Sequence, residues 1–133
     1  MYLLDTDVLS ATWHPARAPR IAAWLQGRAE QEMFLSVITL GEIERGILQQ
    51  EAQAPDRATE LRTWLDRTAT LFGDRLLEFG PDDVRIWGRL SHQIAQGGVE
   101  LMIAATALRH GATIVTGNPA AFRPTGVSVE GLF

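Results

Sequence analysis

The sequence predicts an α/β fold with a central, mainly parallel sheet of about five strands. The first observation is that short apolar runs of strand length recur along the 133 residues, from residues 2–4 to residues 112–116. The second is that the segments between these runs carry apolar residues at helical spacing, as at Ile21, Trp24 and Leu25. Strands that alternate with helices form βαβ units, whose neighbouring strands run parallel.

Each element is predicted from its apolar pattern and from the turn residues that bound it. Strands are expected at residues 2–5, 33–37, 75–79, 112–116 and 127–129. Helices are expected at residues 7–13, 18–28, 39–51, 56–72, 81–96 and 100–110. Gly111 is a suitable C-cap for the helix before it. The stretch 51–57, which contains Pro55, is predicted to be a turn between two antiparallel helices.

Length and composition are those of one globular domain over residues 1–133. Hydrophobic residues make up 46% and charged residues 21%, which excludes a disordered chain. The net charge of −4 argues against binding nucleic acid through bulk charge, although it leaves a local site open. The absence of cysteine excludes disulfides, thiolate metal sites and a cysteine nucleophile.

The start of the chain lacks the pattern of a targeting segment. It enters a predicted strand without the basic segment and apolar stretch of a signal peptide. No apolar run reaches the length of about 18 residues that a membrane-spanning helix needs. We therefore expect a cytoplasmic location and no membrane partner.

The acidic pair Asp5 and Asp7 directly follows the first apolar run. In open α/β sheets, sites lie at the carboxyl ends of the strands, where a carboxylate can meet a metal ion or a phosphate. A structural alternative is that Asp7 or Thr6 caps the next helix. This alternative is weaker for Asp5, because a carboxylate that ends an apolar strand is costly without a partner.

Three further polar residues, Glu42, Glu100 and Asn118, lie at strand exits or helix starts. Each has a structural alternative: a capping box between Thr39 and Glu42, a favourable helix-dipole position for Glu100, and a local turn for Asn118. Together with Asp5, however, all three fall at one edge of a parallel sheet. Clustered carboxylates repel one another and normally hold a cation, and oxygen ligands suit Mg²⁺ or Mn²⁺.

Four segments in order resemble the PIN domain family, and within it the VapC-type toxins of bacterial toxin–antitoxin pairs. They are residues 3–10, 35–42 and 101–107, then 114–118 with Phe122 four residues later. The resemblance implies a three-layer α/β/α domain that cleaves RNA, with tRNA or rRNA as possible targets, using Mg²⁺ or Mn²⁺. It also implies a homodimer, a cognate VapB-type antitoxin, and contact with promoter DNA only through that antitoxin.

The resemblance also implies roles for individual residues. The catalytic and metal-binding acids carried over are Asp5, Glu42 and Glu100. Supporting positions, which would orient water or outer ligands, are Thr6, Asp7, Thr116 and Asn118.

The chain departs from the family pattern at several of these positions. The family usually has asparagine in place of Asp7, aspartate in place of Glu100, and a basic residue in place of Gly117. The loop before Glu100 is also short. Asn118 is followed three residues later by Ala121, where the family often has aspartate. The site therefore has fewer acids toward its C-terminal half, and a second metal would be held weakly.

Two alternatives to a working nuclease remain open at this stage. The first is a binding module of the same fold, whose impaired site leaves only dimerisation and antitoxin binding. The second is an aspartyl-phosphate phosphotransferase, because residues 3–8 also fit an apolar strand followed by Asp-x-Asp, with Asp5 as nucleophile and Asp7 as acid/base. Such enzymes normally need a downstream lysine, and all 12 basic residues of this chain are arginine.

Overall fold

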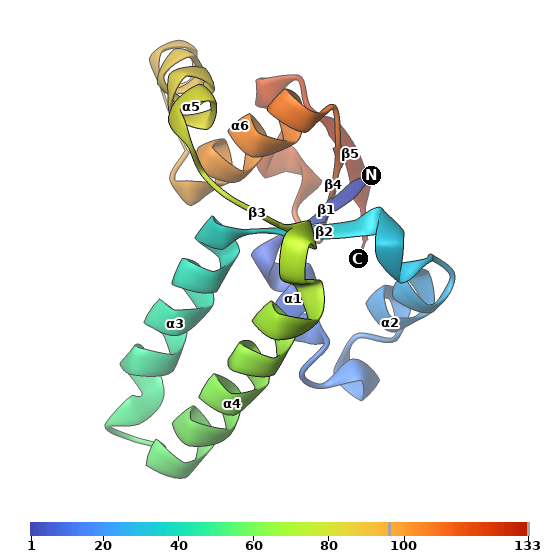
Figure 1. Ribbon diagram of the computed structural model, residues 1–133, viewed down its shortest axis with the longest axis vertical. Helices are drawn as coiled ribbons and strands as arrows, with labels where there is room; N and C mark the ends of the chain where they lie inside the picture. The colour runs from blue at the N-terminus through green and yellow to red at the C-terminus, as the bar shows by residue number, and fades with distance from the viewer. Residues whose placement is uncertain (96, 133) are drawn as a thin grey trace.

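A computed structural model of the chain describes residues 1–95 and 97–132 and contains one five-stranded sheet (Figure 1). The strand order is β3-β2-β1-β4-β5, and all pairings between the described strands are parallel. The strands are β1 (Tyr2–Leu4), β2 (Met33–Ser36), β3 (Leu76–Leu77), β4 (Thr113–Thr116) and β5 (Ser128–Gly131). The predicted α/β fold with a parallel sheet is confirmed.

Within the described residues, six α-helices and several short 3₁₀ turns lie between the strands. They are α1 (Thr6–Ala11), α2 (Pro19–Gln26), α3 (Val37–Glu51), α4 (Pro55–Phe72), α5 (Pro81–Gln93) and α6 (Val99–His110). Pro81 occupies the first turn of α5, and Gly111 ends α6 in the left-handed conformation at φ 63°. Among the described residues, no helix combines the length and the apolar character needed to cross a membrane.

Several predicted elements are shorter than expected; the helix expected at 18–28, for example, spans Pro19–Gln26. The helix expected at 81–96 ends at Gln93, because Ile94 is extended, and its last expected residue lies outside the described part of the chain. The strand expected at 75–79 is reduced to Leu76–Leu77 at the sheet edge. There Arg75 turns its guanidinium onto the carbonyl oxygens of Glu30 and Met33, at 2.6 and 2.7 Å.

The sheet separates two apolar cores, which makes the fold three-layered. Leu3 and Ile114 are paired in neighbouring strands and face the core beneath α5 and α6. The next pair, Leu4 and Val115, faces the opposite core, which α1, α3 and α4 cover. Alternate residues of a strand point to opposite faces, so consecutive apolar residues in β1 and β4 serve both cores. Figure 1 shows α5 and α6 on one side of the sheet and α1, α3 and α4 on the other.

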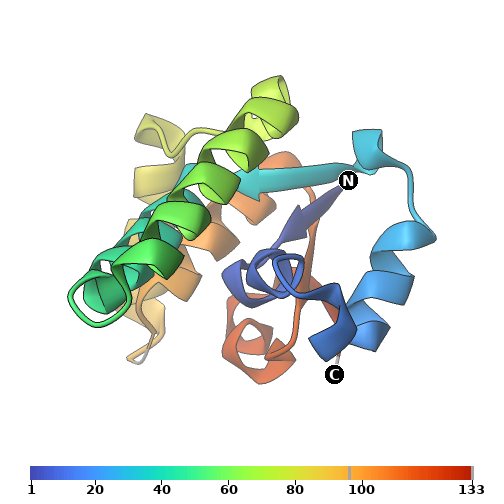
Figure 2. The same ribbon diagram turned by 90° about the horizontal axis from the view of Figure 1, so that it is seen from below.

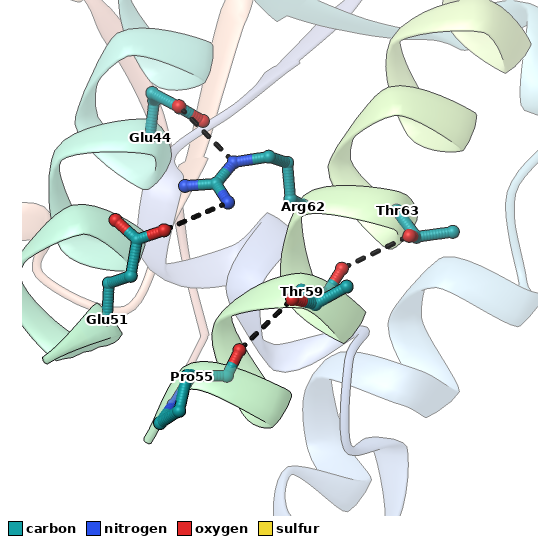
Figure 3. Close-up of polar contacts among 6 residues, drawn as sticks. All are labelled: Glu44, Glu51, Pro55, Thr59, Arg62 and Thr63. Carbon is teal, nitrogen blue, oxygen red and sulfur yellow. Dashed lines mark hydrogen bonds and ion pairs between the residues drawn. The ribbon is translucent and has the colours of Figure 1, made fainter. Parts of the chain in front are cut away.

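Helices α3 and α4 form the predicted antiparallel hairpin, which lies on the opposite side of the molecule from α2 (Figure 2). Arg62 on α4 bridges the two helices through ion pairs to Glu44 at 3.7 Å and Glu51 at 3.5 Å (Figure 3). On α4, the hydroxyls of Thr59 and Thr63 donate to backbone carbonyls one turn earlier. These surface contacts add little stability, so the buried face of the hairpin holds it in place.

The order of the strands determines where a site can form. From β1 the chain adds β2 and β3 on one side, and later adds β4 and β5 on the other. The order therefore reverses between β1 and β4, whose carboxyl ends lie side by side. Such a switch point leaves a crevice outside the strand ends, and ligands bind there in open α/β sheets.

An ion pair between the buried Asp83 and the exposed Arg109 joins α5 to α6. Asp83 is only 1% exposed, and its carboxylate accepts hydrogen bonds from Arg109 Nε and from the Gly80 amide, both at 2.8 Å. Burial tends to raise the pKa of Asp83, but the hydrogen bonds from Arg109 and Gly80 outweigh it, so the pKa lies below its ordinary value.

We expect Asp83→Asn to lower the free energy of unfolding at pH 7 by about 1–3 kcal/mol, because it removes the charge that Arg109 binds. Since the folded-state pKa is lowered, this stabilisation is present above a pH of about 4 and disappears as the pH falls through the lowered pKa. Urea unfolding between pH 3 and 7 measures it, with Asp82→Asn at the exposed neighbour as control. Equal effects of the two variants would contradict the assignment.

Candidate active site

The carboxylate of Asp5 lies at the switch point between β1 and β4. Asp5 follows β1 directly and is the N-cap of α1, where its Oδ1 accepts a hydrogen bond from the Thr6 amide at 2.8 Å. Its Oδ2 accepts a hydrogen bond from the Thr116 hydroxyl at the end of β4, also at 2.8 Å. Only 9% of Asp5 is exposed. The cap expected from Thr6 or Asp7 is therefore made by Asp5 itself.

Burial raises the pKa of Asp5 from its ordinary value of 3.8 to about 6. The hydrogen bond from Thr116 opposes this rise, while the negative charges of Asp7 and Glu42 add to it. A buried carboxylate among like charges gains from binding a proton or a cation. Such a perturbed group at a strand end is a candidate functional residue on physical grounds.

Glu42 reaches this carboxylate from α3 through Thr6. Glu42 Oε1 accepts a short hydrogen bond from Thr6 Oγ1, which also lies 3.1 Å from Thr39 Oγ1. Thr6 thus contacts Asp5 through its amide and Glu42 through its hydroxyl. One residue connects the two predicted acids.

The capping box considered for Thr39 and Glu42 is absent from α3. Ser36 is the N-cap instead, and its Oγ accepts a hydrogen bond from the Ile38 amide at 3.1 Å. Thr39 is fully buried, and its hydroxyl faces Thr6. The contact between Thr39 and Thr6 could not be predicted from sequence, where a capping box was one of two alternatives, because the helix begins two residues earlier than expected.

Asp7 and Gly117 form a second link between β1 and β4. Asp7 Oδ2 accepts a hydrogen bond from the Gly117 amide at 3.0 Å. A Cβ atom at position 117 would lie 2.7 Å from this oxygen and 3.3 Å from the carbonyl oxygen of Leu132. Glycine at position 117 allows this close approach. The two residues that depart from the family pattern, Asp7 and Gly117, are therefore in direct contact. Sequence reasoning recorded both residues but could not pair them.

Thr116 and Asn118 complete this edge of the sheet. The Thr116 hydroxyl accepts a hydrogen bond from the Asn118 amide at 2.9 Å while it donates to Asp5. The Asn118 side chain is exposed and makes no capping hydrogen bond to the 3₁₀ turn that follows. Thr116 therefore orients Asp5, and the Asn118 amide group is available to the crevice.

Glu100 is the predicted acid that the structure does not bring to Asp5 and Glu42. Its Oε2 accepts a hydrogen bond from the Gly98 amide at 3.0 Å, within the loop before α6. The neighbouring residues Val99 and Met102, by contrast, line a hollow together with Glu42. Glu100 thus begins the correct helix, but its carboxylate binds its own loop, as the helix-start alternative predicts.

A divalent metal fits part of this arrangement. The oxygen donors of Asp5 and Glu42 are of the hard type that Mg²⁺ and Mn²⁺ prefer. Burial, together with the negative charges of Asp7 and Glu42, raises the pKa of Asp5, and a bound cation would offset both effects. Within residues 1–95 and 97–132, however, no three carboxylate or imidazole groups lie close enough to hold a metal ion. Asp5 and Glu42 supply two such oxygen donors, while the carboxylate of Glu100 accepts its hydrogen bond from the Gly98 amide.

Comparison with known proteins identifies the family to which this fold belongs. The sequence pattern of the PIN domain matches residues 2–126. The chain belongs to the PIN domain family. This membership confirms the resemblance found in the sequence and leaves the phosphotransferase alternative without support.

Several relatives of this PIN domain carry toxin or ribonuclease names. Ribonuclease VapC14 of Mycobacterium tuberculosis (strain CDC 1551 / Oshkosh) is 45% identical over 65 residues, which cover 49% of this chain and 63% of that protein. Toxin FitB of Neisseria gonorrhoeae (strain ATCC 700825 / FA 1090) is 29% identical, over 97% of this chain and 96% of its own length.

Solved structures share the fold along nearly the whole PIN domain. FitAcB from Neisseria gonorrhoeae has a TM-score of 0.87 at 27% identity, covering 97% of this chain and 96% of that one. VapBC2 from Rickettsia felis, solved with a DNA fragment from its promoter, has a TM-score of 0.78 at 21% identity and covers 99% and 98%. At 21% identity, the similarity to VapBC2 shows a shared fold only.

We expect Asp5→Asn to stabilise the fold in a pH-dependent way. Because the folded-state pKa of Asp5 is raised from 3.8 to about 6, wild-type stability falls as the pH rises through this interval. The neutral variant does not lose this stability. The difference between its free energy of unfolding and that of wild type should therefore grow by about 3 kcal/mol from pH 4 to pH 8. Denaturant unfolding in EDTA measures this.

Asp66→Asn, at an exposed position on α4, is the matched control and should show no such gain. A variant that runs parallel to wild type over the whole pH range would show that the Asp5 carboxylate is not strained by burial.

A second prediction concerns the contact between Asp7 and Gly117. Gly117→Ala should destabilise the fold by about 1 kcal/mol, because the added methyl group displaces the Asp7 carboxylate and breaks its hydrogen bond. In an Asp7→Ala background the same substitution should cost clearly less. A double-mutant cycle of unfolding free energies measures the coupling, and simple additivity would refute it.

Proposed function

We propose that this PIN domain is an endoribonuclease toxin of the VapC type, dependent on Mg²⁺ or Mn²⁺ and neutralised by a cognate VapB-type antitoxin. The observation that carries the proposal is the buried Asp5, held between β1 and β4 and joined to Glu42 through Thr6. Relatives named as a ribonuclease and a toxin support it. Its compartment would be the cytoplasm.

Asp5 and Glu42 would hold the metal ion, with Glu100 as a third ligand once it releases the Gly98 amide. The ion would polarise the scissile phosphate and lower the pKa of an attacking water. Thr116 and Thr6 hold the Asp5 carboxylate in place, so that no rearrangement of this group is needed on binding.

The remaining residues of the crevice act on water and substrate. Asp7 is fixed by the Gly117 amide, which leaves its second oxygen free to orient a water molecule. Asn118 offers both a donor and an acceptor from its exposed side chain. Because Asp5 must be ionised to bind a cation, activity at low metal concentration should rise with pH through about 6.

The partners follow from the same proposal. We infer a homodimer that a VapB-type antitoxin inhibits, with promoter DNA bound only through the antitoxin. An acidic crevice of this kind is well matched by an arginine side chain, which forms paired hydrogen bonds with carboxylates. We therefore expect the antitoxin to place an arginine near Asp5 and Glu42. The RNA target would be a tRNA or an rRNA.

One observation favours a second candidate function, a binding module with an impaired site. Glu100 bonds to its own loop, and no described set of three acids is close enough to hold a metal. In that case the protein would still bind its antitoxin but would neither cleave RNA nor bind Mn²⁺ through Asp5.

Purified, antitoxin-free protein should cleave RNA in Mn²⁺ or Mg²⁺ but not in EDTA. Asp5→Asn and Glu42→Gln should each lower the rate on the order of 100-fold or more, because each removes a charged ligand. Glu44→Gln, two residues farther along α3 and paired with Arg62, is the matched control and should retain activity. Gel analysis of cellular tRNA and rRNA measures cleavage. A folded protein that cuts no RNA with any metal would favour the binding module.

A further inference from the structure

A hollow of about 250 Å³ lies between α1, α3 and α4, beside Glu42 and Thr6. Thr6 and Glu42, which are joined by a hydrogen bond, are among its lining residues. Trp13, just beyond α1, and Trp64 on α4 also line it, with their ring centroids 5.7 Å apart and their planes at 63°. Both indoles are half-buried, so each still exposes part of its surface.

The lining of this hollow suits a flat heterocycle with a polar edge. The aliphatic side chains of Ile43, Ile47 and Leu61 make its floor apolar. In the same lining, the exposed Gln50 offers a hydrogen-bond donor and acceptor, and the exposed Arg57 offers a guanidinium group. Aromatic faces bind bases by stacking, and an arginine can pair with a phosphate or stack on a base.

Glu42 also lines a second, larger hollow of about 550 Å³ between α3 and α6. Arg45 is exposed there and adds a positive charge one turn along α3 from Glu42. Glu42 therefore lines two hollows, each of which also has an arginine, Arg45 in one and Arg57 in the other. A single-stranded RNA that passes Glu42 with its scissile phosphate near Asp5 and Glu42 would place one nucleotide in each hollow.

We propose that the hollow lined by Trp13 and Trp64 is a subsite for one unpaired RNA base next to the scissile phosphate. This rests on the ribonuclease function proposed above. The base, not the phosphate, enters the hollow, because the Glu42 carboxylate in its lining repels an anion and its walls are apolar. A base in a duplex cannot enter, so the subsite selects single-stranded RNA.

The test is binding of a labelled single-stranded RNA octamer to the full chain carrying Asp5→Asn, measured by fluorescence anisotropy. Trp13→Leu and Trp64→Leu should each weaken binding about tenfold, since they keep apolar volume but remove the aromatic face. Trp13→Phe should restore most of the affinity. Trp87→Leu, on α5 and outside the hollow, is the matched control and should bind as the Asp5→Asn chain does.

Other results would overturn the subsite. Unchanged RNA affinity in folded Trp13→Leu and Trp64→Leu proteins would exclude base stacking there. If these variants bind and cleave RNA normally but escape the antitoxin, the hollow is a protein-docking site instead. If the Asp5→Asn chain binds no RNA and the wild-type chain cuts none, the proposed ribonuclease function fails and the subsite fails with it.

Discussion

The hydrogen bond from the Thr116 hydroxyl to Asp5 is the contact on which the site depends. It joins the carboxyl ends of β1 and β4, the two strands between which the strand order reverses. The same hydroxyl is oriented by the Asn118 amide, so its proton is directed at the carboxylate. Without this donor, the buried Asp5 carboxylate would keep only the hydrogen bond from the Thr6 amide.

This arrangement trades stability for function. Asp5 is kept in a buried position where its charge is costly, and Asp7 and Glu42 increase the cost. The two apolar cores on either side of the sheet supply the stability that tolerates it. Position 117 is a glycine, and its lack of a side chain lets the Asp7 carboxylate oxygen approach the backbone closely. Strain of this kind is expected where charge must be ready to bind a cation.

Sequence patterns predicted the fold well because each strand and helix carries its own periodic signal. Short apolar runs located β1 and β4, and the joint placement of Asp5 and Glu42 at strand exits indicated their proximity. Local patterns did not indicate features set by tertiary contacts: the start of α3, the early end of α5, and the hydrogen bond that Glu100 accepts from the Gly98 amide. Glu100 was placed by its position in the motif, whereas its rotamer follows the amides of the short loop before α6. The hollow beside Trp13 depends on three elements that no local pattern relates.

The most direct test is a carboxyl-resolved NMR titration of Asp5 in the wild-type protein, in EDTA and again with saturating Mg²⁺. We expect a pKa of about 6 without metal and a value several units lower with it, because the ion replaces the proton that burial favours. A pKa near 4 in EDTA would contradict the strained carboxylate. A pKa of about 6 that Mg²⁺ leaves unchanged would contradict its role as a metal ligand.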